Sequence, residues 1–173
     1  SHVLYYAVAR AARWLLRAEG ALIANGVSAF SGALTVANVA WLLAAFCRTR
    51  TAVVCGTILL AVSHTFWQLS ASAEVITLST ALLSAELMAV VQWSRTGRLR
   101  WLAAAAILNG LGVSNHNFAL LMWPVYGFAA VWMRSSWRSR WKQLVPIALL
   151  GLLVGMAPVL ILCVAEYTSN RSL

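Results

Sequence analysis

The residues with the most chemical potential lie in the stretch HTFWQLSASAEVITLS, from His64 to Ser79, between two long apolar segments. This stretch combines an imidazole, a carboxamide, several hydroxyl groups and the carboxylate of Glu74. At the N-terminus of a helix the carboxylate would be stabilised as an anion, and it could orient a hydroxyl group or accept a proton. The alternative is that Glu74 only begins the helix and faces water. At about 100° per residue, the polar stripe that starts at Glu74 continues through Thr77, Thr80 and Ser84.

A second polar turn, from Gly112 to Phe118, lies between two short apolar runs. We expect its side chains to converge with those of the first stretch on one outward-facing cavity. Imidazole and carboxylate groups could ligate a metal ion, but no spacing typical of a metal site supports one, so we predict none. The chain has no aspartate and no P-loop or Rossmann glycine pattern, so a self-contained catalytic site is not expected. The residues predicted near the cavity are His2, His64, Gln68, Glu74, Asn115, His116 and Asn117.

Glu86 lies well inside an apolar run, about 120° around the helix from Glu74. An ionisable group at this depth costs about 2.5–3.5 kcal/mol on insertion scales, so we expect it to have a partner or to be protonated. A structural hydrogen bond to a neighbouring helix is the favoured role.

The polar side chains described above must be positioned by helices that lie in a membrane. The chain is 62% hydrophobic and only 10% charged, whereas soluble domains carry about 25% charged residues. A span needs about 20 residues, and the shorter runs must recruit polar ends, which survive at membrane depth only when protein or a wet cavity shields them. We therefore predict an all-α membrane protein, one helical bundle over residues 1–173. Its six predicted spans are 21–46, 51–69, 74–93, 101–115, 117–133 and 144–165.

The loops between these runs alternate in charge. The net charge is +9, which in a soluble protein would suggest nucleic acid, but here the basic residues cluster in short turns and no nucleic-acid partner is expected. The loops at 68–74 and 115–117 contain no basic residue. The positive-inside rule then places the basic loops in the cytoplasm and the polar loops in the lumen or periplasm. The basic loops contain Arg48 and Arg50; Arg95, Arg98 and Arg100; and Arg134, Arg138, Arg140 and Lys142.

The N-terminal segment departs from this rule, because Arg10, Arg13 and Arg17 fall on the non-cytoplasmic side. Their spacing places them on one helical face. We interpret residues 1–20 as an amphipathic helix lying in the membrane interface with its arginines on lipid phosphates. The alternative is a poorly ordered end.

Small residues indicate close helix packing further along the chain. Gly151 and Gly155 form a GxxxG pair, which lets two membrane helices approach closely. Asn25, Asn38 and Asn109 are predicted to form hydrogen bonds between helices.

Four segments resemble one family. Thr65–Ser79 is similar to a tryptophan–glutamine and "AEV–TLN" motif, and Gly110–Asn117 is similar to a "GLSLGNHH" turn. His2–Tyr5 looks like the end of an "HPPGYPLY" segment, and Asn25–Thr35 resembles an "RVNLLSALFGALA" helix. These are motifs of the transmembrane protein O-mannosyltransferases and their bacterial relatives, and the resemblance covers about residues 2–133. It implies the GT-C multi-span glycosyltransferase fold, here as a partial module.

The resemblance also implies a reaction. The family would move a sugar, mannose above all, from a polyprenyl- or dolichyl-phosphate carrier to a Ser/Thr hydroxyl of an acceptor protein. The lipid-phosphate sugar is a co-substrate and no cofactor is implied. Gln68, Glu74, Asn115, His116, Asn117 and His2 would bind the sugar or the lipid phosphate. The family's presumed catalytic aspartate lies upstream of the matched segments, so no catalytic residue is expected in this stretch.

The sequence departs from the family pattern at two places. The prolines of the "HPPGYPLY" segment are absent, and Ser79 stands where the motif ends in asparagine. Two other hypotheses remain open: a transporter or channel with a polar extracytoplasmic cavity, and a non-catalytic structural subunit. We expect a multi-pass protein of the endoplasmic reticulum membrane in a eukaryote, or of the inner membrane in a bacterium.

Overall fold

The computed structural model describes residues 2–132 and 140–170. The regular structure of these residues is α-helical apart from one short 3-10 helix, η1, which confirms the predicted class. The elements in chain order are α1 (Val3–Leu16), α2 (Gly20–Phe46), α3 (Arg50–Ala61), α4 (His64–Ala71), α5 (Val75–Thr96), α6 (Leu99–Asn115), η1 (Asn117–Leu121), α7 (Met122–Trp132) and α9 (Trp141–Asn170).

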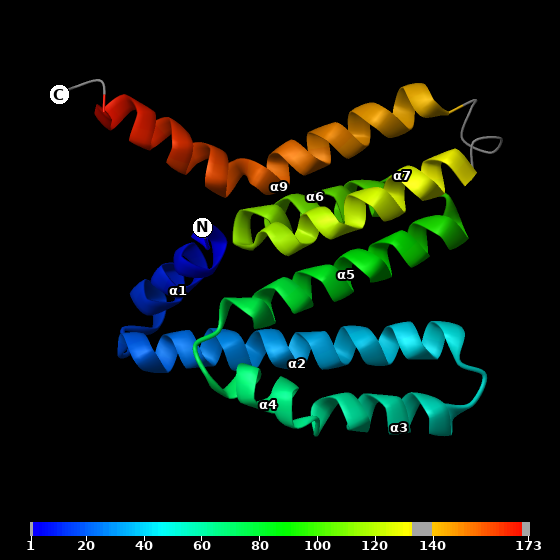
Figure 1. The fold of residues 1–173 in the computed structure, drawn as a ribbon, viewed down its shortest axis with the longest axis horizontal. Helices are drawn as coiled ribbons and strands as arrows, with labels where there is room; N and C mark the ends of the chain where they lie inside the picture. Colours follow the sequence, from blue (N-terminus) through cyan, green and yellow to red (C-terminus); the bar gives the residue numbers. More distant parts are fainter. Residues whose placement is uncertain (1, 133–139, 171–173) are drawn as a thin grey trace.

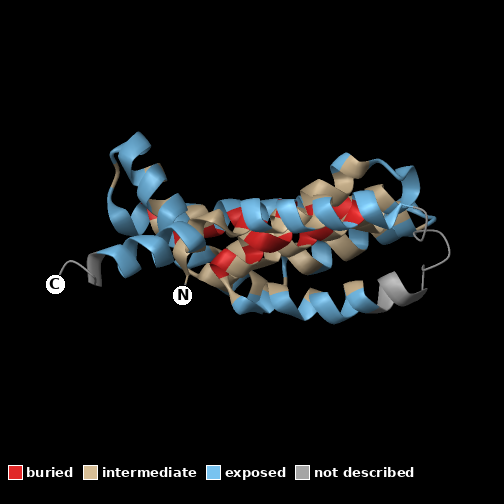
Figure 2. Ribbon diagram, turned by 90° about the horizontal axis from the view of Figure 1, so that it is seen from above, coloured by how far each residue is buried: buried red, intermediate tan, exposed pale blue. Residues whose placement is uncertain are grey.

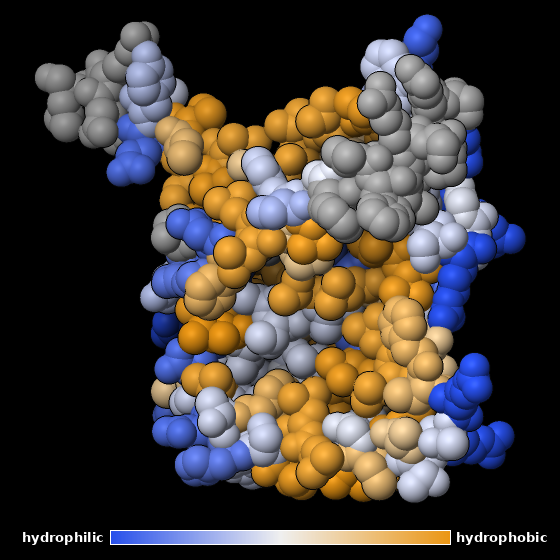
Figure 3. Space-filling view, turned by 45° about the vertical axis from the view of Figure 1, so that its right-hand side comes forward, coloured by the Kyte–Doolittle hydropathy of each residue, from blue (hydrophilic) through white to orange (hydrophobic). Residues whose placement is uncertain are grey.

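From α2 onward the chain runs back and forth along one axis (Figure 1). α5 packs on α2 and on α6, and α6 packs on α9. The buried residues lie along the middle of the bundle (Figure 2). Figure 3 shows a broad hydrophobic surface between hydrophilic groups at the left and right edges of the view. Lipid is the environment that such a surface requires, so the chain is a multi-pass integral membrane protein.

The number of spans is smaller than predicted. By length and composition, three helices can cross a membrane: Gly20–Phe46, Val75–Thr96 and Trp141–Thr168. A fourth span is possible if the bent pair α3 and α4 crosses as one unit. The prediction of six spans is therefore not confirmed, because α6 has 17 residues and α7 only 11 after the turn of η1.

The predicted run at 51–69 is not one straight helix. α3 and α4 meet at 56°, because Val62 ends α3 and Ser63 adopts an extended backbone before α4 begins. Serine favours this N-cap conformation, although its side chain makes no capping hydrogen bond here. The bend separates the helix that carries Gln68 from the axis of the bundle.

The α6–α9 contact explains the small residues of the GxxxG pair. A Cβ atom added at Gly155 would lie 2.9 Å from the Cα atom of Gly110 and would also overlap the Ile107 carbonyl oxygen. A Cβ atom at Gly151 would lie 2.8 Å from the Cβ atom of Ala106. The Ser114 hydroxyl donates a hydrogen bond across the same contact to the Gly155 carbonyl oxygen, at 3.2 Å. Close approach through small residues is confirmed.

The basic turns gather at one end of the bundle (Figure 1). Arg95 donates a hydrogen bond to the Ala45 carbonyl oxygen at 2.5 Å, and its guanidinium lies 5.8 Å from the centre of the Phe46 ring. These contacts join the α5–α6 turn to the α2–α3 turn. Arg134 and Arg138 lie outside the described residues. The α4–α5 turn, the α6–η1 turn and α1 lie at the opposite end, as the alternation of charge predicts for this chain.

Helix α1 packs against α2, α6 and α9 at that opposite end. The predicted helix is therefore present as an ordered element, and it ends at Arg17, whose φ is 52°. The location of the helix at a membrane surface remains a prediction.

Candidate functional site

Asn115 is the centre of the polar end of the bundle and is fully buried. Its side-chain nitrogen donates to the Val75 carbonyl oxygen at 2.9 Å and to the Ser79 hydroxyl at 2.8 Å. Its side-chain oxygen accepts from the Tyr5 backbone N–H at 3.1 Å. One carboxamide thus joins α6 to α1 and to α5. The role of Asn115 that these bonds show is to hold the three helices together.

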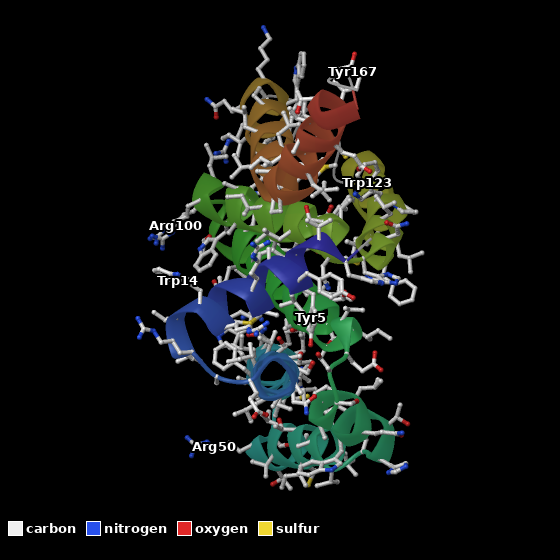
Figure 4. The ribbon with its side chains drawn as sticks, turned by 90° about the vertical axis from the view of Figure 1, so that its left-hand side faces the viewer. Tyr5, Trp14, Arg50, Arg100, Trp123 and Tyr167 are labelled. Atoms are coloured by element: carbon white, nitrogen blue, oxygen red, sulfur yellow. The ribbon has the colours of Figure 1, made fainter. Side chains whose placement is uncertain are left out.

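Ser28 makes a second junction beside Asn115. The Glu74 backbone N–H donates to the Ser28 hydroxyl at 2.9 Å, and that hydroxyl lies 3.2 Å from the Glu74 carbonyl oxygen. The Tyr5 hydroxyl lies 3.2 Å from the same Ser28 oxygen and donates to the Ala24 carbonyl oxygen at 2.9 Å. Figure 4 looks onto this end and shows Tyr5 between helices α1 and α2. The first turn of α5 is therefore held by α1 and α2 through backbone atoms.

This arrangement leaves the Glu74 carboxylate unengaged within the described residues. Glu74 is the N-cap residue of α5, but its side chain makes no capping hydrogen bond, and the residue is half-buried. Both of its bonds to Ser28 come from the backbone. The carboxylate thus lies at the N-terminus of α5 with no hydrogen-bond partner among the described residues.

Two histidines complete this end. The rings of His2 and His116 stack with their centres 5.3 Å apart. His2 Nδ1 lies 3.1 Å from the Asn115 carbonyl oxygen, which only accepts, so Nδ1 carries the hydrogen. His116 Nδ1 accepts from the Phe118 N–H at 3.2 Å. In their neutral forms His2 therefore offers an acceptor at Nε2 and His116 a donor at Nε2.

The remaining predicted site residues lie further out. Asn117 is exposed at the start of η1. Gln68 and His64 are exposed on α4, and no hydrogen bond of their side chains joins them to the histidine pair within the described residues. The structure thus brings together His2, Glu74, Asn115 and His116, whereas the bend before α4 places Gln68 on a separate helix.

The predicted polar stripe of α5 faces α2. The Thr35 and Thr80 hydroxyl oxygens are 3.3 Å apart, and Asn38 donates to the Ser84 hydroxyl at 3.0 Å. Thr77 is buried, and its hydroxyl donates to the Glu74 carbonyl oxygen at 2.8 Å. The stripe beyond Glu74 therefore serves helix packing. Asn38 confirms the predicted interhelical role, whereas Asn25 is exposed.

Glu86 belongs to a separate buried cluster. It is 1% exposed and accepts from Asn109 Nδ2 at 2.9 Å and from the Tyr126 hydroxyl. Trp123 Nε1 donates to Asn109 Oδ1 at 3.0 Å. These bonds join α5, α6 and α7 and confirm the predicted structural hydrogen bond of Glu86, whereas the sequence identified neither Asn109 nor Tyr126 as its partner.

This end of the bundle presents one carboxylate, one imidazole donor and one imidazole acceptor. Within residues 2–132 and 140–170 no group of three or more His, Cys, Asp or Glu side chains is placed to hold a metal ion. Sequence reasoning missed Tyr5 and Ser28 as the residues that fix this end. A tyrosine three residues from the candidate site residue His2 was the one available signal.

Comparison with known proteins identifies the family of the chain. The family model described as Protein O-mannosyl-transferase TMEM260 N-terminal domain matches residues 2–141. The matched segment includes His2, Glu74, Asn115 and His116 and both motif-bearing turns. No curated protein and no solved structure matches the chain. The resemblance seen in the sequence is confirmed: the chain belongs to the protein O-mannosyl-transferase TMEM260 N-terminal domain family.

Proposed function

We propose that this chain binds the substrates of a membrane-embedded protein O-mannosyltransferase of the GT-C type. The sugar passes from a polyprenyl-phosphate carrier to a Ser/Thr hydroxyl of an acceptor protein on the lumenal or periplasmic side. The observation that carries this proposal is the Glu74 carboxylate, which forms no hydrogen bond with the described residues and directly precedes Val75, the residue whose carbonyl oxygen accepts from Asn115. The family match supports the reaction class.

Each residue at this end would have a separate role in binding the substrates. A carboxylate accepts hydrogen bonds from sugar hydroxyl groups, so Glu74 would orient mannose. The Nε2–H group of His116 would donate to a phosphate or sugar oxygen, and His2 Nε2 would accept from a hydroxyl group. Asn115 is a positioning residue, because all its polar atoms are engaged by the protein. Gln68 and Asn117 would line the outer approach.

The transfer itself is a displacement at the anomeric carbon. The acceptor oxygen forms the new C–O bond, the bond from the anomeric carbon to the phosphate oxygen breaks, and polyprenyl phosphate leaves. The acceptor loses its hydroxyl proton to a base, and we assign that proton transfer to none of the residues above. Their contribution is to hold sugar and acceptor in an orientation for attack.

Two alternatives draw less support from the structure. An intramembrane carboxylate on a substrate path would favour a transporter, but Glu86 is buried and hydrogen-bonded to Asn109 and Tyr126. A purely structural subunit offers no reason for a carboxylate at the N-terminus of α5 that forms no hydrogen bond with the described residues.

Glu74→Gln tests the proposal. The backbone bonds to Ser28 do not involve the side chain, so the variant should insert and fold normally. Loss of a charge-assisted hydrogen bond of about 1.5–3 kcal/mol corresponds to roughly a 10- to 150-fold lower transfer rate. The measurement is mannose transfer from polyprenyl-phosphate mannose to an acceptor protein, in membranes that contain the protein.

The matched control is Glu19→Gln, which removes one exposed carboxylate at the N-cap of α2. It should leave transfer unchanged. Wild-type transfer by the Glu74→Gln variant would remove Glu74 from the site. Flux of a solute through proteoliposomes without any sugar transfer would favour the transporter hypothesis instead.

A further inference from the structure

A pocket of about 620 Å³ lies on the C-terminal half of α1. The pocket is open to its surroundings and has room for a phosphate group. The residues that line it are Arg10, Arg13, Trp14, Leu15 and Arg17.

The three guanidinium groups of this pocket have no protein counter-ion. Arg10, Arg13 and Arg17 are exposed, and no carboxylate forms an ion pair with them within the described residues. Like charges held around one pocket repel one another, and a shared anion relieves that repulsion. The planar fork of arginine matches the oxygen atoms of a phosphate group in particular.

The rim of the pocket is apolar. Trp14 is 83% exposed, Leu15 72% and Leu16 65%. In water these side chains would expose a contiguous apolar patch beside three charges. Tryptophan favours the headgroup level of a bilayer, and leucine at that level reaches the acyl boundary. The combination therefore fits a lipid headgroup better than a free ion.

The position of α1 along the chain also supports placing its arginines at the headgroup level of the bilayer. Only residues 17–19 separate α1 from Gly20, where the membrane-spanning helix α2 begins. The Arg13 guanidinium nitrogen lies 3.9 Å from where a Cβ atom of Gly20 would stand. Tyr5, 4% exposed, anchors the other half of α1 to Ala24 and Asn115. The arginines are thus held at the level where the spanning helix leaves the membrane.

The pocket is separate from the proposed transfer site. Arg10 to Arg17 lie 5 to 12 residues beyond Tyr5, or roughly 7 to 18 Å along the helix axis at 1.5 Å per residue. Figure 4 shows Trp14 at the edge of the bundle, away from Tyr5. A carrier lipid delivering its sugar to Glu74 would place its phosphate near the histidines instead.

We infer that Arg10, Arg13 and Arg17, with Trp14 and Leu15, form a binding site for the phosphate headgroup of an anionic phospholipid of the surrounding leaflet. The phosphate sits between the guanidinium groups and the acyl chains pass beside Trp14 and Leu15. The site docks α1 on the bilayer surface. This inference does not depend on the proposed transferase activity.

Photo-crosslinking of the full chain in nanodiscs tests the inference. A photoreactive benzoylphenylalanine replaces Leu16, beside the pocket. Three tracer lipids are compared at equal concentration: phosphatidylglycerol, phosphatidylcholine and polyprenyl phosphate. We expect phosphatidylglycerol to be labelled several-fold more than phosphatidylcholine, and the excess to fall as salt concentration rises.

Charge-neutral variants make the test specific. Replacing Arg10, Arg13 and Arg17 with glutamine should lower the phosphatidylglycerol-to-phosphatidylcholine ratio about five-fold for each residue replaced, until it reaches one. The same three positions changed to lysine should keep a preference, which shows that α1 remains folded when the guanidinium groups are absent. The matched control changes the exposed Arg48, Arg50 and Arg98 at the opposite end to glutamine and should keep the full ratio.

Equal labelling of the two phospholipids by the unmodified chain would overturn the inference. Preferential labelling of polyprenyl phosphate over phosphatidylglycerol would also overturn it and would assign the pocket to the carrier lipid. An equal fall of the ratio in the control variant would show that net charge alone, not this pocket, attracts the lipid. Loss of sugar transfer in the Glu74→Gln variant bears on the proposed function and leaves the inference untouched.

Discussion

The side chain of Asn115 joins three helices, since the residue belongs to α6 and its carboxamide bonds Tyr5 of α1 and Val75 and Ser79 of α5. A side chain with every polar atom engaged cannot be replaced by an apolar one without stranding its partners. Asn117, two residues further along the chain, is exposed at the start of η1. Variants of the two residues can therefore be compared, one with a buried carboxamide bonded by the protein and one with an exposed carboxamide.

Asn115→Leu should lower the free energy of unfolding by about 1–3 kcal/mol, because the Tyr5 N–H and the Ser79 hydroxyl lose their partner. The thermal midpoint in detergent measures this. Asn117→Leu is the control and should leave the midpoint unchanged. Equal midpoints for the two variants would mean that Asn115 does not hold α1 on the bundle.

At Glu86, two substitutions distinguish the contribution of the negative charge from that of the hydrogen bonds. Glu86→Gln keeps a side-chain oxygen that can accept from Asn109 and Tyr126, so we expect little change in stability. Glu86→Leu leaves both donors buried without an acceptor and should cost about 1–3 kcal/mol. The readout is the unfolding midpoint of each variant. If glutamine were as damaging as leucine, the network would need a carboxylate, not only an acceptor.

At the scale of elements, the tightest contact is that between α6 and α9. Gly155→Ala would press a methyl group against the backbone of Ile107 and Gly110, and backbone cannot move aside as a flexible side chain can. Overpacking of this kind costs about 1–3 kcal/mol. Gly127→Ala on α7 is the control, since an added Cβ atom meets nothing within 4 Å there. We expect a lower thermal midpoint for the first variant and an unchanged or higher one for the second.

The sequence predicted some elements better than others. α2 and α5 were found because each is long and apolar enough to span a membrane alone. The break between α3 and α4 was missed because Val62 and Ser63 are neither proline nor glycine. The GxxxG pair predicted close packing on α9, but nothing in the spacing of Gly151 and Gly155 identified α6 as the partner.

The candidate site could be predicted from the sequence only in part. The alternation of loop charge placed His2, Glu74 and His116 at one end, and the structure brings them there. The roles of Tyr5 and Ser28 depend on backbone atoms of Ala24 and Glu74. Backbone partners leave no residue-type pattern, so these roles could not be inferred from sequence.

At the scale of the whole molecule, the chain has two chemically different ends. Basic turns lie at one end, and the turns that carry Glu74, Asn115 and His116 lie at the other, with His2 beside them. Within the described residues, the arginines of α1 interrupt this division, and they stand beside exposed tryptophan and leucine side chains. A bilayer interface accounts for both facts, because it favours basic turns in the cytoplasm and tolerates arginine wherever lipid phosphate is within reach.

This division predicts that the two ends face opposite compartments. With the three free cysteines replaced by alanine, single reporters are placed by Thr96→Cys at the basic end and Asn117→Cys at the polar end, both at exposed positions. A membrane-impermeant maleimide added outside sealed vesicles of known orientation should label one reporter, and only permeabilised vesicles should label both. The positive-inside rule assigns the Thr96 position to the cytoplasm. Permeabilised vesicles control for reactivity, since each cysteine must react there. Labelling of both reporters from the same compartment would place the Glu74 end and the basic turns on one face, and a bundle crossing the bilayer along the α2 axis would then be excluded.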